Sequence, residues 1–325
     1  MISSRQFEHT RPPALRQGDT VGIVAPASGF RREDFETGCD RLRALGYQPF
    51  YLQSIFERDL YFAGSAERRI SELHEMFRRP EVTAIVCARG GYGCNYLLPQ
   101  LDLDLIRAHP KIFAGCSDVT TLLTYLCDYA GLVTFHAPMV AGDFSRPDGI
   151  DLEAWSAAVG SGKHYLRTFT SHEVQPLVEG NAEGILYGGC LSLLCASLGT
   201  PYEIQSRGSI LFVEDRGEKP YQIDRMLMQL KLAGKFEGVK GIIFGEMLDC
   251  GQPNTAGGPL HDLVTRILGD LGIPIAFGLK SGHVSSQSFT LPFGVSAALT
   301  VGNEVVLNVE AAVQAEPVSV RVSPS

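Results

Sequence analysis

Ser117 lies in a segment that could present a serine hydroxyl for acyl transfer. The apolar run 112–116 before it is typical of a strand, and residues 118–129 after it have the pattern of a helix. A serine on a sharp strand-to-helix turn projects its hydroxyl out of the sheet, beside the free N–H groups of the helix N-terminus. The local sequence Gly-Cys-Ser-Asp differs from the familiar Gly-x-Ser-x-Gly motif, so a residue that only caps the helix is the alternative.

A serine nucleophile needs a general base and a third group that orients this base. Among the eight histidines, His283 is the best-placed base, because it stands in a loop of small residues after a predicted strand; a structural role is the alternative. Glu214 and Asp215 end another apolar strand, where buried carboxylates are costly unless they are paired. A salt bridge to Arg216 or Lys219 would be the structural explanation, and the pattern does not choose between the two acids.

The tetrahedral intermediate of acyl transfer needs two N–H donors. The N–H of Asp118 follows the serine at the helix N-terminus, and the turn at Gly90 and Gly91 lets a second stretch of backbone approach closely; an ordinary tight turn is the alternative. This turn lacks the spacing of a dinucleotide fingerprint and has no Walker lysine. The sequence also shows no spacing typical of metal ligands, so we expect neither a metal nor a cofactor.

Two other residues and one other class of protein remain open at this point. His136 ends a predicted strand, where it either lines a site or sits in the core. Cys116 is a rival nucleophile, because strand alternation places its side chain and that of Ser117 on opposite faces and only one of them can face a cleft. A non-catalytic α/β ligand-binding protein would use the same strand-end crevice without turnover.

The composition favours a globular protein with two domains. The chain has 325 residues, of which 45% are hydrophobic, and this length is large for one compact domain. The net charge is −8 and no basic cluster stands out, which argues against nucleic acid as the main partner. No stretch approaches the ~20 apolar residues of a membrane span, so no membrane partner is expected either.

The cysteine pattern and the first residues favour a cytoplasmic location. Eight cysteines without a Cys-x-x-Cys pair, several of them in apolar segments, are typical of small buried residues rather than of a disulfide framework. Residues 1–9 contain no apolar core of signal-peptide length. We therefore expect a reduced, cytoplasmic protein.

Alternating strands and helices in the first half predict parallel strands covered on both faces, with sites outside their carboxyl ends. We expect an N-terminal α/β domain over 1–150 that carries the nucleophile, a linker region over 151–180 with a short helix around Trp155, and a mixed α/β domain over 181–325 that carries the acid and the base. The predicted strands cover 20–25, 47–52, 82–87, 112–116, 184–187, 209–213, 241–244, 275–279, 288–291, 296–301 and 304–309, and the longer predicted helices cover 33–45, 66–79, 118–129, 188–198, 221–232 and 260–271.

Taken together, the motifs of this chain resemble the LD-carboxypeptidase family of serine peptidases. The match runs in order from about residue 18 to residue 308, and its separate motifs are weaker than the ordered set. The motifs are Arg-Gly-Gly-Tyr-Gly at 89–93, Gly-Cys-Ser-Asp at 115–118, Glu-Asp at 214–215 with Tyr-Gln-Ile-Asp-Arg at 221–225, Gly-His at 282–283 and Leu-Pro-Phe-Gly at 291–294.

The resemblance implies a flavodoxin-like N-terminal domain and a smaller C-terminal domain with β-barrel character. It also implies a triad in which Ser117 is the nucleophile, His283 the base and Glu214, rather than Asp215, the orienting acid. The oxyanion hole would be formed by the N–H of Asp118 and a glycine N–H of the Gly90–Gly91 turn. Cys116 departs from the tyrosine or other residue that is frequent in the family, and we expect no consequence because this side chain should point back into the sheet.

The resemblance further implies a small peptide substrate. The family removes the terminal D-alanine from the murein tetrapeptide during cell-wall recycling, and a sister branch cleaves microcin-C-like peptidyl nucleotides and aminoacyl-sulfamoyl adenylates. Arg89 is a candidate for binding the terminal carboxylate, with a structural ion pair as the favoured alternative. Trp155 could stack on a nucleobase, although plain helix packing is favoured. Relatives tend to be homodimers, so the resemblance also implies a homodimer.

Overall fold

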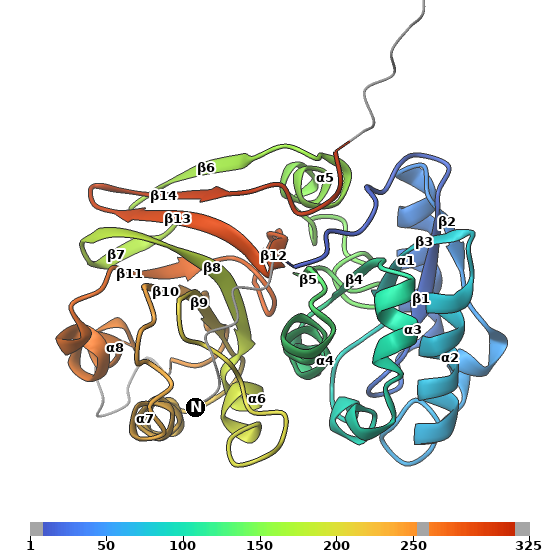
Figure 1. Cartoon of the computed structure of the whole chain (residues 1–325), viewed down its shortest axis with the longest axis horizontal. Helices are drawn as coiled ribbons and strands as arrows, with labels where there is room; N and C mark the ends of the chain where they lie inside the picture. Colours follow the sequence, from blue (N-terminus) through green and yellow to red (C-terminus); the bar gives the residue numbers. More distant parts are fainter. Residues whose placement is uncertain (1–8, 252–259, 316–325) are drawn as a thin grey trace, which may run out of the picture.

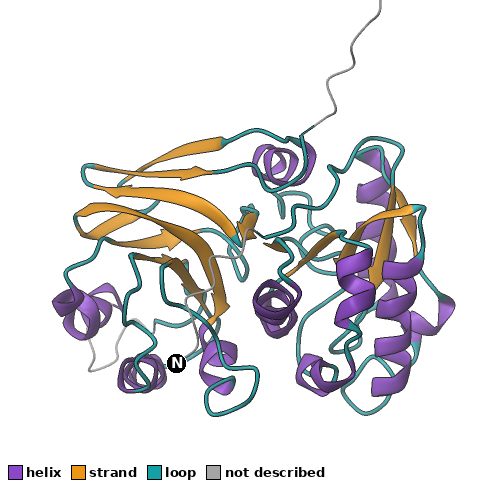
Figure 2. Cartoon of the chain, viewed as in Figure 1, coloured by secondary structure: helices purple, strands orange, loops and turns teal. Residues whose placement is uncertain are grey.

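The alternating strands and helices of the first half fold into a parallel sheet. The computed structural model of the chain describes residues 9–251 and 260–315, and Figures 1 and 2 show two sheets with the helices packed around them. The first sheet has the strand order β12-β5-β4-β3-β1-β2. Its five parallel strands thus follow the 2-1-3-4-5 order of flavodoxin-like folds, as predicted. They are β1 (Thr20–Val24), β2 (Gln48–Phe50), β3 (Val82–Cys87), β4 (Ile112–Gly115) and β5 (Thr134–His136).

The longer helices of this half lie close to the predicted ranges 33–45, 66–79 and 118–129, and the short helix over 103–108 was not predicted. In α2 (Ala66–Arg78), the Ser65 hydroxyl accepts a hydrogen bond from the Arg68 N–H at 3.2 Å, and the apolar face that includes Leu73 and Phe77 is buried. The α-helices are completed by α1 (Arg32–Ala44), α3 (Leu103–Ala108) and α4 (Thr120–Tyr125), and the shorter turns are η1 (Gln53–Phe56), η2 (Cys94–Tyr96), η3 (Leu98–Gln100), η4 (Ser117–Val119) and η5 (Leu126–Ala130).

The second half builds a mixed sheet in the order β6-β14-β13-β8-β9-β10-β11-β7. Its centre is parallel from β8 to β11, and its flanks are antiparallel. Strand β7, at one end of this order, also contacts β14, which is next to the other end. The sheet therefore curls toward a barrel, as Figure 1 shows. The strands are β6 (Tyr165–Thr170), β7 (Gln175–Val178), β8 (Gly180–Cys190), β9 (Ser209–Glu214), β10 (Gly241–Gly245), β11 (Ile275–Leu279), β13 (Val295–Val301) and β14 (Glu304–Val309).

The region predicted as a linker, 151–180, contributes to the second sheet instead. It contains α5 (Leu152–Gly160), which is the helix expected around Trp155, and then the strands β6 and β7. These strands lie at the two ends of the sheet and are mostly exposed or half-buried, and their polar composition therefore resembled that of a loop. The remaining helices of this half are α6 (Leu191–Ala196), α7 (Pro220–Leu232), α8 (Leu260–Leu268) and η6 (Gly269–Leu271).

Strand β12 (Leu291–Phe293) crosses the expected boundary between the two halves. It comes from the second half of the sequence but pairs antiparallel with β5 at the edge of the first sheet. Helix α4 contacts both β5 and β8 and lies between the two sheets (Figure 1). Buried residues of both sheets, such as Phe135 and Phe212, belong to one continuous apolar cluster. The two halves are therefore joined by a shared core and a shared strand.

All eight cysteines are buried and free, and burial was predicted for those that lie in apolar segments. In the part of the chain that the structure describes, no helix is both long and apolar enough to cross a membrane. The start of the chain, on which the expectation of a missing signal peptide depends, lies outside the described residues except for His9.

A carboxyl at the contact between the two halves predicts a pH-dependent stability. The Tyr187 hydroxyl of β8 donates a 2.7 Å hydrogen bond to Asp128 Oδ2 in η5, and burial raises the pKa of Asp128 to about 7. The folded protein therefore holds a proton that the unfolded chain releases near pH 4. The contribution of this protonated carboxyl to the unfolding free energy is complete below pH 4 and is lost as the pH rises through 7. The loss amounts to roughly 2 to 4 kcal/mol.

The variant Asp128→Asn should remove this dependence, because its carboxamide oxygen still accepts the Tyr187 hydrogen bond but does not ionise. Urea unfolding at pH 5 and pH 8 measures the effect as the difference in unfolding free energy between the variant and the wild type. We expect the unfolding free energy of the variant, relative to that of the wild type, to be higher at pH 8 than at pH 5. An equal difference at both pH values would contradict the assignment.

Candidate active site

Ser117 stands on a strained turn directly after β4. Its φ is +61°, one of four positive φ values among the non-glycine residues that the structure describes, and its side chain is partly exposed. Cys116 remains extended, and η4 begins at Ser117. The change from extended to left-handed backbone turns the serine side chain out of the strand direction, as in a nucleophile elbow. The hydroxyl thus lies at the carboxyl end of β4, where the flavodoxin-like topology places sites.

The glycine turn after β3 packs against this serine. A Cβ on Gly90 would lie 2.7 Å from Ser117 Cβ and 2.9 Å from its Oγ, so only glycine allows this approach. Gly91 has φ +107° and packs against Ser28, whose hydroxyl accepts the Tyr92 N–H at 3.1 Å. The Asp118 N–H belongs to the first turn of the helix, where no helical carbonyl precedes it. The two proposed sources of oxyanion donors therefore flank Ser117.

Two buried charged side chains hold the glycine turn in place, and the sequence analysis did not single them out for this role. Asp118 Oδ2 accepts the Cys94 N–H at 2.8 Å, and burial raises the pKa of Asp118. The Arg69 guanidinium donates to the carbonyls of Pro26 and Gly93 at 2.6 and 2.8 Å. Asp118 thus contributes its side chain to the loop, and its backbone belongs to the first turn after Ser117.

The variant Gly90→Ala should lower kcat by about 10²-fold, because displacing a reacting group by ~1 Å costs a factor of that size. The added methyl group must push either the glycine turn or the Ser117 side chain away from its position. The matched control is Gly302→Ala, where the added methyl group meets no atom within 4 Å and the backbone needs no positive φ. Steady-state kinetics and a melting curve of both variants check this, and wild-type kcat in Gly90→Ala would contradict the packing argument.

Glu214 and His283 form a hydrogen-bonded pair. Glu214 is the last residue of β9 and is completely buried, and His283 lies in the loop after β11 with 22% of its side chain exposed. Glu214 Oε2 accepts from the His283 backbone N–H at 3.1 Å and lies 2.9 Å from its Nδ1. A carboxylate at this position fixes the proton on Nδ1 and leaves Nε2 free to accept a proton from a serine.

The electrostatics of the pair favour an ionised acid beside a basic imidazole. Burial opposes ionisation of Glu214, but the imidazoles of His283 and His136 outweigh burial and hold the pKa of this carboxyl well below its ordinary value. Burial likewise lowers the pKa of His283, but the charge and the hydrogen bond of Glu214 outweigh it, and the net pKa is raised. The pair can therefore accept a proton and stabilise the resulting imidazolium.

Short contacts join the nucleophile's segment to the strand that carries the acid. Cys190 of β8 pairs in register with Glu214, and its N–H donates a 3.0 Å hydrogen bond to the hydroxyl of Thr120, three residues after Ser117. Within the described residues, no hydrogen bond connects Ser117 to His283. Catalytic hydrogen bonds of unliganded enzymes are frequently long and shorten only in the substrate complex.

The structure also separates the two acids and the two nucleophile candidates. Asp215 Oδ2 accepts the Ser192 N–H and Oδ1 accepts the Arg216 N–H, both at 2.8 Å, so this carboxylate serves backbone groups rather than the imidazole. Cys116 is only 1% exposed, and burial raises the pKa of its thiol well above the ordinary value. A buried, protonated thiol is a poor nucleophile, which disfavours the cysteine-hydrolase alternative.

Arg89 and Trp155 occupy very different environments. Arg89 is exposed beside the glycine turn and donates a 3.0 Å hydrogen bond to the Gly29 carbonyl; over the described ranges it forms no ion pair, so the structural ion pair that the sequence favoured is absent there. Trp155 is 1% exposed and packs edge-on against Phe144 at 5.3 Å between ring centroids. This burial gives Trp155 the packing role, and its ring offers no free face to a ligand.

The side chain of Arg146, from the first half of the chain, holds the loop that carries His283. Arg146 donates to the carbonyls of Val284 and Ser286, each at 3.3 Å, and its guanidinium pairs with Asp143 Oδ1 at 3.0 Å. The local pattern of this stretch is that of a turn-rich loop, and nothing in it shows that the loop meets the one after β11.

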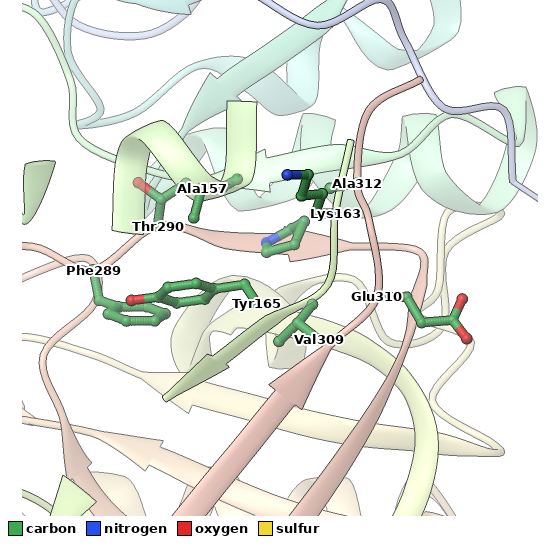
Figure 3. Close-up of a pocket in the computed structure, with 10 residues that line it drawn as sticks. Ala157, Lys163, Tyr165, Phe289, Thr290, Val309, Glu310 and Ala312 are labelled. Atoms are coloured by element: carbon green, nitrogen blue, oxygen red, sulfur yellow. The ribbon is translucent and has the colours of Figure 1, made fainter. Parts of the chain in front are cut away.

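The structure also contains a small pocket, between α5, β6 and the segments next to β12 and β14. Figure 3 shows the neighbouring rings of Tyr165 and Phe289, which are tilted by 37° relative to each other, on one side of it. None of its lining residues belongs to the candidate active site. Over 9–251 and 260–315, no group of three or more histidine, cysteine, aspartate or glutamate side chains has the arrangement of a metal site.

Comparison with known proteins agrees with this geometry. The family model described as LD-carboxypeptidase N-terminal domain matches residues 21–137, and the one described as LD-carboxypeptidase C-terminal domain matches residues 183–299. A probable murein peptide carboxypeptidase of Bacillus subtilis is 40% identical over 296 residues, which cover 90% of this chain and 92% of that protein.

Two solved structures show the same fold over nearly the whole chain. The muramoyltetrapeptide carboxypeptidase from Oxalobacter formigenes has a TM-score of 0.80 and 29% identity, and the alignment covers 90% of this chain and 98% of that one. The structure of MccF in complex with glutamyl sulfamoyl guanosine has a TM-score of 0.85 and 26% identity, with 94% and 99% covered.

The fold and the comparisons define a hydrolase of the serine-peptidase class. More narrowly, the chain belongs to the LD-carboxypeptidase family, and it is a serine-type carboxypeptidase.

Proposed function

We propose that this protein removes the terminal D-alanine from the murein tetrapeptide with a Ser117–His283–Glu214 triad. The observation that carries this proposal is the pair of a completely buried Glu214 and His283, 2.9 Å apart, at the junction where the strained Ser117 turn lies. Relatives named for murein peptides are 40% and 32% identical to the chain, which supports the choice of substrate.

Acylation begins when His283 Nε2 takes the proton of the Ser117 hydroxyl as its oxygen attacks the scissile carbonyl. Glu214 holds the Nδ1 tautomer and stabilises the imidazolium that forms. The developing oxyanion accepts hydrogen bonds from the Asp118 N–H and from an N–H of the Gly90–Gly91 turn. The imidazolium then protonates the leaving amine, so the bond between the L-configured centre and D-alanine breaks and an acyl-enzyme remains.

Deacylation uses the same groups in reverse. His283 removes a proton from a water molecule, which attacks the ester carbon of acylated Ser117, and the returned proton restores the serine hydroxyl. A carboxypeptidase must also recognise the free carboxylate of its substrate. Arg89 is the proposed partner, because its exposed guanidinium lies beside the glycine turn and has no acidic partner within the described residues.

The second candidate substrate is an aminoacyl-sulfamoyl adenylate or a related peptidyl nucleotide. The likeness to MccF in complex with glutamyl sulfamoyl guanosine favours it. The burial of Trp155, the only tryptophan of the chain, weighs against a stacking role for that ring. The murein tetrapeptide is therefore the leading substrate.

Mass spectrometry distinguishes these possibilities. The protein is incubated separately with murein tetrapeptide and with an aminoacyl-sulfamoyl adenylate, and the products are followed over time. Loss of one D-alanine from the tetrapeptide supports the proposal, and selective cleavage of the adenylate supports the alternative. Tight binding of either compound without turnover would instead indicate a ligand-binding protein.

A cytoplasmic location and a homodimer complete the proposal. Eight buried free thiols fit a reducing compartment, and the homodimer follows from the family resemblance. Light scattering at several protein concentrations measures the oligomeric state.

A further inference from the structure

A second histidine, which the mechanism does not use, lies against the buried acid. His136 is the last residue of β5, is completely buried, and packs between the rings of Phe212 and Phe293. Its Nε2 lies 3.8 Å from Glu214 Oε1, the carboxylate oxygen that His283 does not use. Neither His136 Nε2 nor Glu214 Oε1 has a hydrogen-bond partner within the described residues. Two buried polar atoms therefore face each other without another partner.

Hydrogen bonding on the other side of the ring decides where one proton lies. His136 Nδ1 is 3.0 Å from the Ser281 hydroxyl, and that hydroxyl donates its single hydrogen to the Phe289 carbonyl at 2.7 Å. The hydroxyl can therefore only accept from His136, so Nδ1 carries a hydrogen.

The state of Nε2 then has two possibilities. If Nε2 carried no hydrogen, its lone pair would face the lone pairs of a buried carboxylate, and both atoms would stay desolvated without compensation. If Nε2 carries a hydrogen, the ring is an imidazolium, and a movement of about 1 Å converts the 3.8 Å approach into a charge-assisted hydrogen bond.

We propose that His136 is a positioning residue that holds Glu214 from the side opposite His283, as an imidazolium whose Nε2–H is directed at Oε1. Glu214 then lies between two imidazoles, with His283 at Oε2 and His136 at Oε1. Gly282 makes this possible, because a Cβ there would lie 2.7 Å from His136 Cε1 and 2.8 Å from Glu214 Cδ. This inference rests on the proposed role of Glu214 in the triad.

The arrangement links the acid to the sheet that carries the nucleophile. His136 is aligned with Gly115 across the β4–β5 ladder, two residues before Ser117. The first sheet thus carries both Ser117 and the side chain that holds Glu214, although Glu214 itself ends a strand of the second sheet. His136 contacts neither substrate nor the reacting atoms, so its effect on the reaction passes through Glu214.

Several other titratable or charged groups act on the same cluster and set the background for any pH effect. They come from β4 and its turn, the 143–146 loop, β8, and the segments after β9 and β10. The groups are Cys116, Asp143, Cys190, Asp215, Arg216 and Cys250.

Two variants separate the charge of His136 from its hydrogen bond. His136→Gln places an uncharged amide N–H near the position of Nε2, and His136→Phe keeps a ring of similar shape without any donor. We expect kcat/KM to fall by about 10²-fold or more in His136→Phe and to recover most of this loss in His136→Gln, since a buried charge without a partner is costly.

The pH profile gives a readout that a purely structural role would not move. Without a positive charge at position 136, Glu214 acts on His283 alone, so the imidazolium of His283 becomes more stable. The acid limb of kcat/KM should then shift to higher pH in both variants. Wild-type activity and an unmoved limb in folded His136→Phe would overturn the proposal.

Nitrogen-15 NMR of the wild-type imidazoles tests the charge directly, even if neither variant folds. We expect both nitrogens of His136 to carry hydrogens at a pH above the acid limb of activity, where Nδ1 alone carries one in His283. An unprotonated His136 Nε2 at a pH where the enzyme is active would refute the inference. This readout needs no turnover of murein tetrapeptide, so a wrong substrate assignment and a wrong role for His136 give different results.

Discussion

Ser117→Ala should lower kcat for D-alanine release by about 10⁴- to 10⁶-fold while the protein stays folded. The hydroxyl is the only group on this turn that can form the acyl-enzyme, because the neighbouring thiol of Cys116 is buried and protonated. Alanine tolerates the left-handed backbone at this position about as well as serine, so the melting temperature should change little. Steady-state kinetics and a thermal melt measure the two quantities.

The control for this experiment is Cys116→Ala, which removes the rival nucleophile. We expect it to keep most of the wild-type kcat and to lose some stability, because a buried side chain becomes smaller. The mass of an acylated intermediate, trapped with a slow substrate, should disappear in Ser117→Ala and persist in Cys116→Ala. The opposite pattern would transfer the reaction to the cysteine.

Glu214→Gln should lower kcat by about 10³- to 10⁴-fold, as expected when the group that fixes the imidazole tautomer loses its charge. The glutamine has nearly the same shape, but its amide cannot stabilise the imidazolium of His283. In the wild type, Glu214 raises the pKa of His283, so the acid limb of kcat/KM should lie above pH 6.5. Without the charge, the imidazolium loses its stabilisation, and the limb of Glu214→Gln should move to lower pH.

Asp215→Asn is the matched control, since this neighbouring carboxylate accepts hydrogen bonds from the backbone of Ser192 and Arg216. We expect a small change in kcat and an acid limb that stays near its wild-type position. A larger loss in Asp215→Asn than in Glu214→Gln would show that the wrong acid has been placed behind His283.

The sequence was sufficient for the parts of the site that depend on local pattern. The apolar strand before Ser117, the helix after it and the glycine turn at 90–91 can be recognised from neighbouring residues. Parallel topology then places the ends of β3 and β4 at one edge of the sheet. Most element positions of the first half follow from the same reasoning, whereas the flavodoxin-like strand order was implied by the family resemblance.

The choice between Glu214 and Asp215 needed tertiary information. Alternation along a strand separates their side chains, but which side faces the first sheet depends on how the two sheets pack. The contact of His136 with Glu214 was out of reach for the same reason, because it joins β5 of one sheet to β9 of the other. The family resemblance supplied the assignment of the acid that local pattern left open.

Strands β12 and β6 were not predicted, because the local sequence patterns of short strands and of strands at the edge of a sheet are weak. Strand β12 has three residues, one of them Pro292, and only its pairing with β5 makes it a strand of the first sheet. Strand β6 alternates exposed and less exposed residues at the end of the second sheet, so its composition resembles that of a loop. Pairing partners distant in sequence, rather than local propensity, decide such elements.

The place of β12 affects how the enzyme is made. Until residue 293 has left the ribosome, the edge of β5 lacks its partner, and His283 has emerged only ten residues earlier. A nascent chain can form the parallel strands of its first half at that stage, but the open edge of β5 exposes backbone groups to pairing with other chains. Completion of this sheet and assembly of the hydrolytic centre therefore coincide once residues 283–293 have emerged, so partial chains released before that point carry the serine without the base that activates it.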